Sequence, residues 1–157
     1  MKEPQTLRLK SELQIKIETL LPDIVTGSQL ALEELVRIGK PAVEILITIL
    51  LSDEDSDVRY NAAFALGLIG LAKAVRAEVL EPAVGALIVA LRDEDYNLRE
   101  NSAWALGEIG KAKAVSAEVL EPAIGVLIEL LDDNTNYQVR NTANWALEQI
   151  TGSPYEF

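Results

Sequence analysis

The chain has 157 residues, carries a formal net charge of −11, and contains neither cysteine nor histidine. Apolar residues make up 49% and charged residues 25%, which is typical of a folded globular domain and not of a disordered chain. The missing residue types exclude disulfides, thiolate and imidazole metal ligands, and nucleophile–histidine pairs. Composition leaves carboxylate pairs open, but no motif marks a metal, cofactor or catalytic site, so we expect none of the three. The pI near 4.4 disfavours nucleic-acid and anionic-membrane partners, because both attract a basic surface.

Neither the start of the chain nor its interior carries a targeting or membrane signal. Residues 1–14 lack the apolar stretch of a signal peptide, and no run of about 18 apolar residues occurs. The absence of cysteine fits a reducing compartment. We therefore expect a soluble, cytoplasmic protein.

The first predicted element is an N-terminal helix. Its apolar residues recur at helical spacing, at Leu13, Ile17, Leu20, Leu21 and Ile24. Proline inside a helix removes a backbone hydrogen bond, so we expect Pro22 to break this helix. The next segment, residues 30–39, is a weak copy of a pattern that recurs later in the chain, and it ends at Gly39 shortly before Pro41.

The rest of the chain repeats itself at an interval of about 40 residues. Segment 58–70 reappears at 98–110 and again at 139–152, and the connecting segments 72–83 and 112–123 differ at a single position. We therefore expect one domain over residues 1–157. It would consist of a cap with a partial repeat (1–39), three repeats (40–70, 71–110 and 111–152) and a tail (153–157).

Each repeat opens with a predicted helix that starts at a proline, namely Pro41, Pro82 or Pro122. The apolar residues that follow form one helical stripe in each copy: Val43, Leu46, Ile47 and Leu50; Val84, Leu87, Ile88 and Leu91; and Ile124, Leu127, Ile128 and Leu131. The alanine-rich segments 72–80 and 112–120 predict an extra helical turn or two before the second and third of these helices.

A second helix follows in each repeat after an acidic loop. Loops 52–55, 93–95 and 132–134 supply N-cap oxygens and negative charge at the helix start. The first of these helices is predicted to bury Val58, Ala62, Ala65, Leu66 and Ile69. Gly70 and Gly110 are predicted to end two of them as C-caps. No segment alternates as a strand does, so the sequence predicts an all-α protein.

Two amphipathic helices cannot bury their apolar stripes alone, so successive pairs must stack. The predicted fold is a right-handed α–α superhelix of about three helix pairs, with N-terminal helices capping one end. Polar substitutions in the last copy are expected of a cap at the other end: Asn144 replaces Ala63 and Ala103, and Glu148 replaces Gly67 and Gly107.

These motifs resemble HEAT repeats, in particular the phycobilisome-lyase-type HEAT-like variety. The family pattern, an Asp followed by Val-Arg, Ala and Ala-Leu-Gly-x-Ile-Gly, runs here from Asp53 to Gly70 and from Asp93 to Gly110, and the third copy departs from it. The resemblance implies that Asp and Arg side chains of neighbouring repeats form a structural ladder inside the stack. The residues that match it are Asp53, Arg59, Asp93, Arg99, Asp133 and Arg140; Asp133 lies one residue further from its Arg than in the other copies.

An aromatic residue occupies one position of every second helix, at Phe64, Trp104 and Trp145. Because a helix turns about 100° per residue, this position lies opposite the predicted buried side, and the three rings form a column. The resemblance implies that the second helices line a concave, partner-binding face. The candidate binding residues are Tyr60, Asn61, Phe64, Leu68, Glu100, Asn101, Trp104, Glu108, Asn141 and Trp145.

Another interpretation of the column stays open at this point. The rings can pack between adjacent second helices as part of the core, or stack on a small ligand. Gly67 and Gly107, one turn further along, either leave room beside a ring or allow close helix packing.

The main functional hypothesis is a non-enzymatic scaffold that binds a protein or peptide segment in the concave groove. The net charge predicts a basic or neutral partner, and Trp104→Ala is expected to abolish binding and leave folding intact. The resemblance to bilin-lyase subunits supports an alternative, a subunit that handles a tetrapyrrole or a phycobiliprotein. A third possibility is a stack of duplicated or consensus-like repeats with no ligand, or one that self-associates; the sequence leaves the oligomeric state open.

Overall fold

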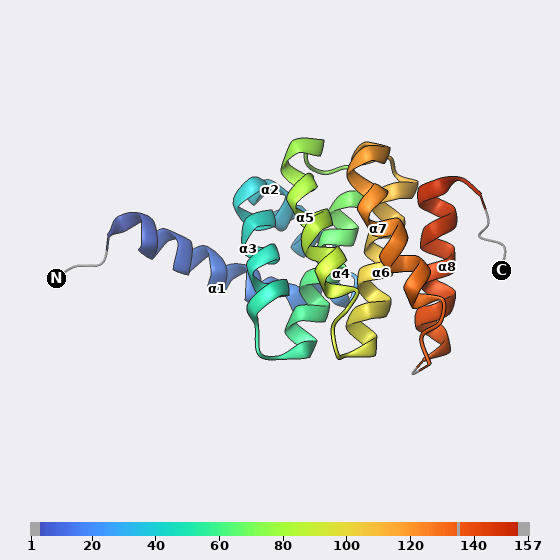
Figure 1. Cartoon of the computed structure of the whole chain (residues 1–157). Helices are drawn as coiled ribbons and strands as arrows, with labels where there is room; N and C mark the ends of the chain where they lie inside the picture. The colour runs from blue at the N-terminus through green and yellow to red at the C-terminus, as the bar shows by residue number, and fades with distance from the viewer. Residues whose placement is uncertain (1–3, 135, 154–157) are drawn as a thin grey trace.

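In the computed structural model, which describes residues 4–134 and 136–153, the chain forms eight α-helices and no strand within those residues (Figure 1). The helices are, in chain order, α1 (Gln5–Val25), α2 (Gln29–Ile38), α3 (Lys40–Ser52), α4 (Ser56–Leu71), α5 (Ala77–Ala90), α6 (Tyr96–Lys111), α7 (Ala117–Leu130) and α8 (Tyr137–Thr151). The predicted all-α class is confirmed. None of these helices is both long and apolar enough to cross a membrane.

The six helices from α3 to α8 form two layers. Helices α3, α5 and α7 stand side by side in the first layer, and α4, α6 and α8 stand side by side in the second layer behind it (Figure 1). Each first-layer helix also packs on the second-layer helix that follows it in the chain. The predicted solenoid of three stacked helix pairs, preceded by N-terminal helices, is therefore confirmed.

The core lies between the layers and between neighbouring pairs. In α3, Val43, Leu46 and Leu50 of the predicted stripe are buried, and Ile47 is half-buried. In α4 the predicted residues 62, 65, 66 and 69 are buried, whereas Val58 is only half-buried. Ala63 and Gly67 are buried as well, because α4 is packed on one side by α1 and on the other by α6.

The N-terminal helix is longer than predicted. Helix α1 continues through Pro22 as far as Val25, so the prediction of a break at Pro22 is wrong. Pro22 is exposed, whereas Leu21 and Ile24 beside it are each only 1% exposed. The ring of Pro22 therefore meets no neighbouring helix, and burial of the side chains beside it outweighs the backbone hydrogen bond that proline cannot form.

Helices α5 and α7 begin five residues before their prolines. Pro82 and Pro122 lie in the second turn, so the prediction that they start these helices is wrong; Pro41 does lie in the first turn of α3. Both misassigned prolines are exposed, as Pro22 is. Residues 77–80 and 117–120, predicted as extra turns, are the first turns of α5 and α7 themselves.

The second-layer helices end later than predicted. Helices α4 and α6 run past Gly70 and Gly110 and are capped by Ala72 and Ala112, so the prediction of C-cap glycines is wrong. The residues with left-handed backbone are Lys73 (φ 49°) and Lys113 (φ 54°). A Cβ at Gly70 would overlap Cγ1 of Ile109, and one at Gly110 would lie 2.9 Å from Cγ1 of Ile150. These glycines therefore allow neighbouring second-layer helices to approach closely.

Candidate binding surface

The aromatic residues of the second layer pack against glycines of the preceding helix. A Cβ added at Gly67 of α4 would lie 2.6 Å from Cζ3 of Trp104 on α6. A Cβ at Gly107 of α6 would overlap Cζ3 of Trp145 on α8 in the same way. Each glycine thus provides the space that the tryptophan of the next repeat occupies. In the last repeat this position is Glu148, which is exposed.

The rings of Phe64 and Trp104 also stack on each other. Their centroids are 5.0 Å apart and their planes differ by 12°. Phe64, Trp104 and Trp145 are all half-buried and pack against the core. The two interpretations of the aromatic column are therefore compatible, because each ring packs between helices and still keeps part of its surface exposed. Trp104→Ala would remove packing as well as exposed ring surface.

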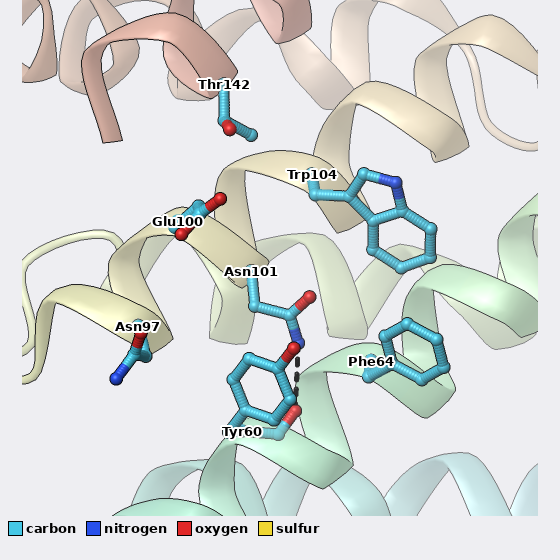
Figure 2. Close-up of a pocket in the computed structure, with 7 residues that line it drawn as sticks. All are labelled: Tyr60, Phe64, Asn97, Glu100, Asn101, Trp104 and Thr142. Carbon is cyan, nitrogen blue, oxygen red and sulfur yellow. Dashed lines mark hydrogen bonds between the residues drawn. The ribbon is translucent and has the colours of Figure 1, made fainter. Parts of the chain in front are cut away.

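A hollow of about 260 Å³ opens beside this stack, between α4 and α6 (Figure 2). It is lined by Tyr60, Phe64, Asn97, Glu100, Asn101, Trp104 and Thr142. Five of these seven are candidate binding residues of the sequence analysis. Figure 2 shows Tyr60 and Phe64 projecting from α4, and Glu100 and Trp104 projecting from α6, around a common space.

Asn97 and Thr142 line the hollow but were not among the predicted residues. Asn97 precedes Asn101 by one helical turn, so it shares a face of α6 with a residue that was predicted. Thr142 occupies in α8 the repeat position of Asn61 and Asn101. Both could have been found by extending the predicted face one turn toward the helix start and one repeat further along the chain.

Electrostatics in the hollow are dominated by Glu100, the only charged residue among those that line it. Burial raises the pKa of the Tyr60 hydroxyl above its ordinary value, and the negative charge of Glu100 raises this pKa further. Asn101 is only 6% exposed, and its amide donates a hydrogen bond of 3.0 Å to the carbonyl oxygen of Tyr60. Asn101 therefore ties α6 to α4 at the floor of the hollow.

The remaining predicted binding residues do not line the hollow. Asn61 and Leu68 of α4 are half-buried, and Asn141 of α8 is exposed. Glu108 lies on α6 one turn beyond Trp104 and is only 8% exposed. Its Oε2 atom is buried without a hydrogen-bond partner.

Charged side chains link the loops that precede the second-layer helices. Arg59 of α4 pairs with Asp93 of the next repeat at 3.2 Å, and Arg99 of α6 pairs with Asp133 at 3.0 Å. Each arginine also donates to a carbonyl of its own loop, Arg59 to that of Asp53 at 2.8 Å and Arg99 to that of Asp93 at 2.9 Å. Each arginine therefore joins its own loop to the loop of the next repeat.

The first and last loops, which contain Asp53 and Asp133, form fewer of these contacts between repeats. Asp53 lies in the first loop of the series, and its side chain accepts the backbone N–H of Asp55 at 2.9 Å. Arg140 donates to the carbonyl of Asp133 in its own loop. The N-cap of α8 is Asn136, whereas Asp55 and Asp95 cap α4 and α6 as predicted for the acidic loops.

Comparisons with known proteins place the fold in a family. A family model of HEAT repeats matches residues 43–148, about two thirds of the chain. The chain therefore belongs to the HEAT-repeat family. No curated protein matches the sequence.

Several solved structures are similar. Two engineered proteins are 25% and 27% identical, with TM-scores of 0.63 and 0.65, and the matches cover 88% and 85% of this chain. A designed armadillo repeat protein solved in complex with the peptide (KR)4 is 21% identical, with a TM-score of 0.63 over 94% of this chain. The matches span 63%, 55% and 60% of those three chains, so this chain is shorter than the proteins it resembles.

Proposed function

We propose that this protein is a non-enzymatic scaffold that binds an extended segment of a partner protein on the second-layer surface, meaning the side of α4, α6 and α8 that faces away from the first layer. The observation that carries the proposal is the hollow beside the Phe64–Trp104 stack. Rings that are already held by packing lose little conformational freedom when a partner covers them, which suits them to be anchors of a binding site.

The polar residues around the hollow supply the rest of a recognition site. Asn97 is exposed, and Glu100 and Thr142 are half-buried, so their side chains can pair with polar groups of a bound segment. Aromatic contact area combined with a few polar groups is the common composition of binding sites.

Net charge supports a basic or neutral partner. The chain carries a formal charge of −11, and Glu100 is the one charged residue lining the hollow. Binding of a basic segment would be weakened by added salt, since exposed charges are screened within about 10 Å at moderate ionic strength. Two structural neighbours are designed armadillo proteins, one in complex with the peptide (KR)4 and one described as designed for modular peptide recognition. They support the proposal only through their fold.

Selection from a phage-displayed library of random dodecapeptides tests this proposal without assuming a sequence. We expect one family of peptides to be enriched, and expect its binding to be lost in Asn97→Arg, which places a long side chain at the mouth of the hollow. Val89→Arg is the matched control, because Val89 is 63% exposed on the first-layer helix α5 and the charge change is the same. Peptides that bind both variants equally well, or no enrichment at all, would contradict the proposal.

A further inference from the structure

One face of α6 carries two carboxylates with a tryptophan between them. Glu100, Trp104 and Glu108 are spaced four residues apart, so they share one face of the helix. At a rise of about 1.5 Å per residue, the two glutamates stand about 12 Å apart along the helix. The neighbouring second-layer helices do not repeat this arrangement: the equivalents of Glu100 are Tyr60 and Asn141, and those of Glu108 are Leu68 and Gln149.

Glu108 is the more unusual of the two. It is more than nine-tenths buried, and its Oε2 atom has no hydrogen-bond partner. A buried carboxylate oxygen without a partner is destabilising, because it loses its hydration and receives nothing in return. The leucine and glutamine at the equivalent positions show that the fold does not require a carboxylate there.

Among the residues that the structure describes, no second-layer arginine or lysine forms an ion pair with Glu108 or Glu100. Arg59 and Arg99 are engaged with the loop carboxylates of Asp93 and Asp133, and Arg140 donates to the loop carbonyl of Asp133. The other basic residue of α6, Lys111, is exposed. The other charged residue of α8, Glu148, adds further negative charge.

We infer that the partner segment carries basic side chains: Glu100 pairs directly with one of them at the hollow, and the charge of the buried Glu108 favours another on the far side of Trp104. This inference rests on the proposed function, because it names the chemistry of the segment that the second-layer surface would take. Arginine fits this site well, since a guanidinium can stack on an aromatic ring and pair with a carboxylate through two hydrogen bonds. Figure 2 shows the carboxylate of Glu100 and the ring of Trp104 at the hollow, where one such side chain would enter.

The inference explains why a destabilising carboxylate is present. In the free protein Glu108 lowers the stability of the fold, and a cation bound nearby would offset its negative charge. Gln at this position keeps the size of the side chain and removes its charge. Glu108→Gln is therefore expected to make the free protein more stable and to make it a weaker binder.

The test uses two octapeptides, one of alternating arginine and serine and one with citrulline, a neutral isostere, in place of each arginine. Binding is followed by intrinsic fluorescence, because both tryptophans of the chain lie in the second layer. We expect the arginine peptide to bind about tenfold more tightly than the citrulline peptide. Glu100→Gln and Glu108→Gln should each weaken binding about fivefold or more. Glu121→Gln, at an exposed position of α7, carries the same charge change and should have less than about a twofold effect.

The possible failures are distinguishable. Equal affinities for the two octapeptides, absence of binding to both, or equal effects of the three substitutions would overturn the inference. If the library nevertheless yields neutral peptides whose binding Asn97→Arg abolishes, the proposed function stands and only the basic character of the partner is wrong. A midpoint of urea unfolding that is lower in unliganded Glu108→Gln than in the parent would overturn the view of Glu108 as an uncompensated charge.

Discussion

The two layers of the stack join neighbouring repeats by different contacts, although their glycines and ion pairs look alike in the sequence. In the first layer, no atom lies within 4 Å of a Cβ placed at Gly85 or Gly125. The ion pair between Arg92 and Glu129 in that layer leaves both side chains more than half exposed, at 61% and 63%. The second layer differs on both counts.

Second-layer glycines are crowded, and the ion pairs that join the loops before these helices are far less exposed than the first-layer pair. Gly67 and Gly107 face tryptophan rings, and the Arg99–Asp133 pair leaves its side chains only 11% and 7% exposed. Glycines and ion pairs thus form close contacts between repeats in the second layer and only open, solvent-exposed ones in the first. We therefore expect the register between repeats to depend more on the second layer than on the first.

The largest expected difference is between two of the inter-repeat ion pairs, Arg99–Asp133 in the second layer and Arg92–Glu129 in the first. Arg99→Ala would leave Asp133 without its guanidinium partner in a buried setting, and we expect it to destabilise the protein by about 3 kcal/mol. Arg92→Ala removes an exposed pair and should cost less than about 1 kcal/mol. Urea denaturation of both variants measures the difference. Equal losses of stability would contradict the distinction between the layers.

The next largest expected loss of stability comes from disturbing the contact between Gly107 and Trp145. A Cβ at Gly107 would overlap the ring of Trp145, so Gly107→Ala should destabilise the protein by about 1–3 kcal/mol. In a Trp145→Ala background the ring is gone, and the same substitution should cost at least about 1 kcal/mol less. A double-mutant cycle measured by urea denaturation gives this coupling. If the stability losses of the two substitutions simply add, the Trp145 ring does not need the space that Gly107 provides.

Substitution of the first-layer glycines by alanine is expected to raise stability, whereas Gly107→Ala lowers it. Gly85 and Gly125 lie inside helices with open space around them, so Gly85→Ala and Gly125→Ala should each stabilise the protein by about 0.5–1 kcal/mol. Thermal unfolding of these two variants beside Gly107→Ala provides the comparison. A loss of stability at either first-layer position would show that this layer is packed more tightly than the structure indicates.

The smallest expected effect is a shift in the ionisation of Tyr60. Burial and then Glu100 raise its pKa above the ordinary value of about 10, so the folded state disfavours the phenolate. Above that pH the unfolded state ionises first, and this tyrosine makes stability fall as pH rises. Ultraviolet titration should show a late-titrating tyrosine that is absent in Tyr60→Phe. In Glu100→Gln its midpoint should move down, though not to the ordinary value, because burial remains; an unmoved midpoint would place Glu100 too far from the hydroxyl to act on it.

Periodicity predicted the architecture because it follows from residues that every repeat shares. The apolar stripe of α3 and the burial of Ala62, Leu66 and Ile69 in α4 are dictated by helical spacing and were found where predicted. The proline and glycine predictions failed for one common reason. Local preferences assign Pro82 to a helix start and Gly70 to a helix end, but tertiary packing and solvent exposure decide both positions.

The candidate site was predictable only in part. Helical geometry indicated which side of the second helices carries Phe64 and Trp104, but it could not distinguish a packed ring from an exposed one. The exposure of each ring depends on the distance between neighbouring helices, which Gly67 allows to be short. This distance is a property of two adjacent repeats, so the sequence of one repeat does not reveal it. The burial of Glu108 was unpredictable for the same reason, since it arises from the helices on both sides of α6.

Heteronuclear NMR during titration with the arginine–serine octapeptide would show whether the second-layer surface binds a basic segment. We expect saturable shifts of the Trp104 indole N–H and of backbone amides around Tyr60 and Glu100, with the amides of α3, α5 and α7 unchanged. Shifts spread evenly over both layers, or confined to the first layer, would contradict this expectation.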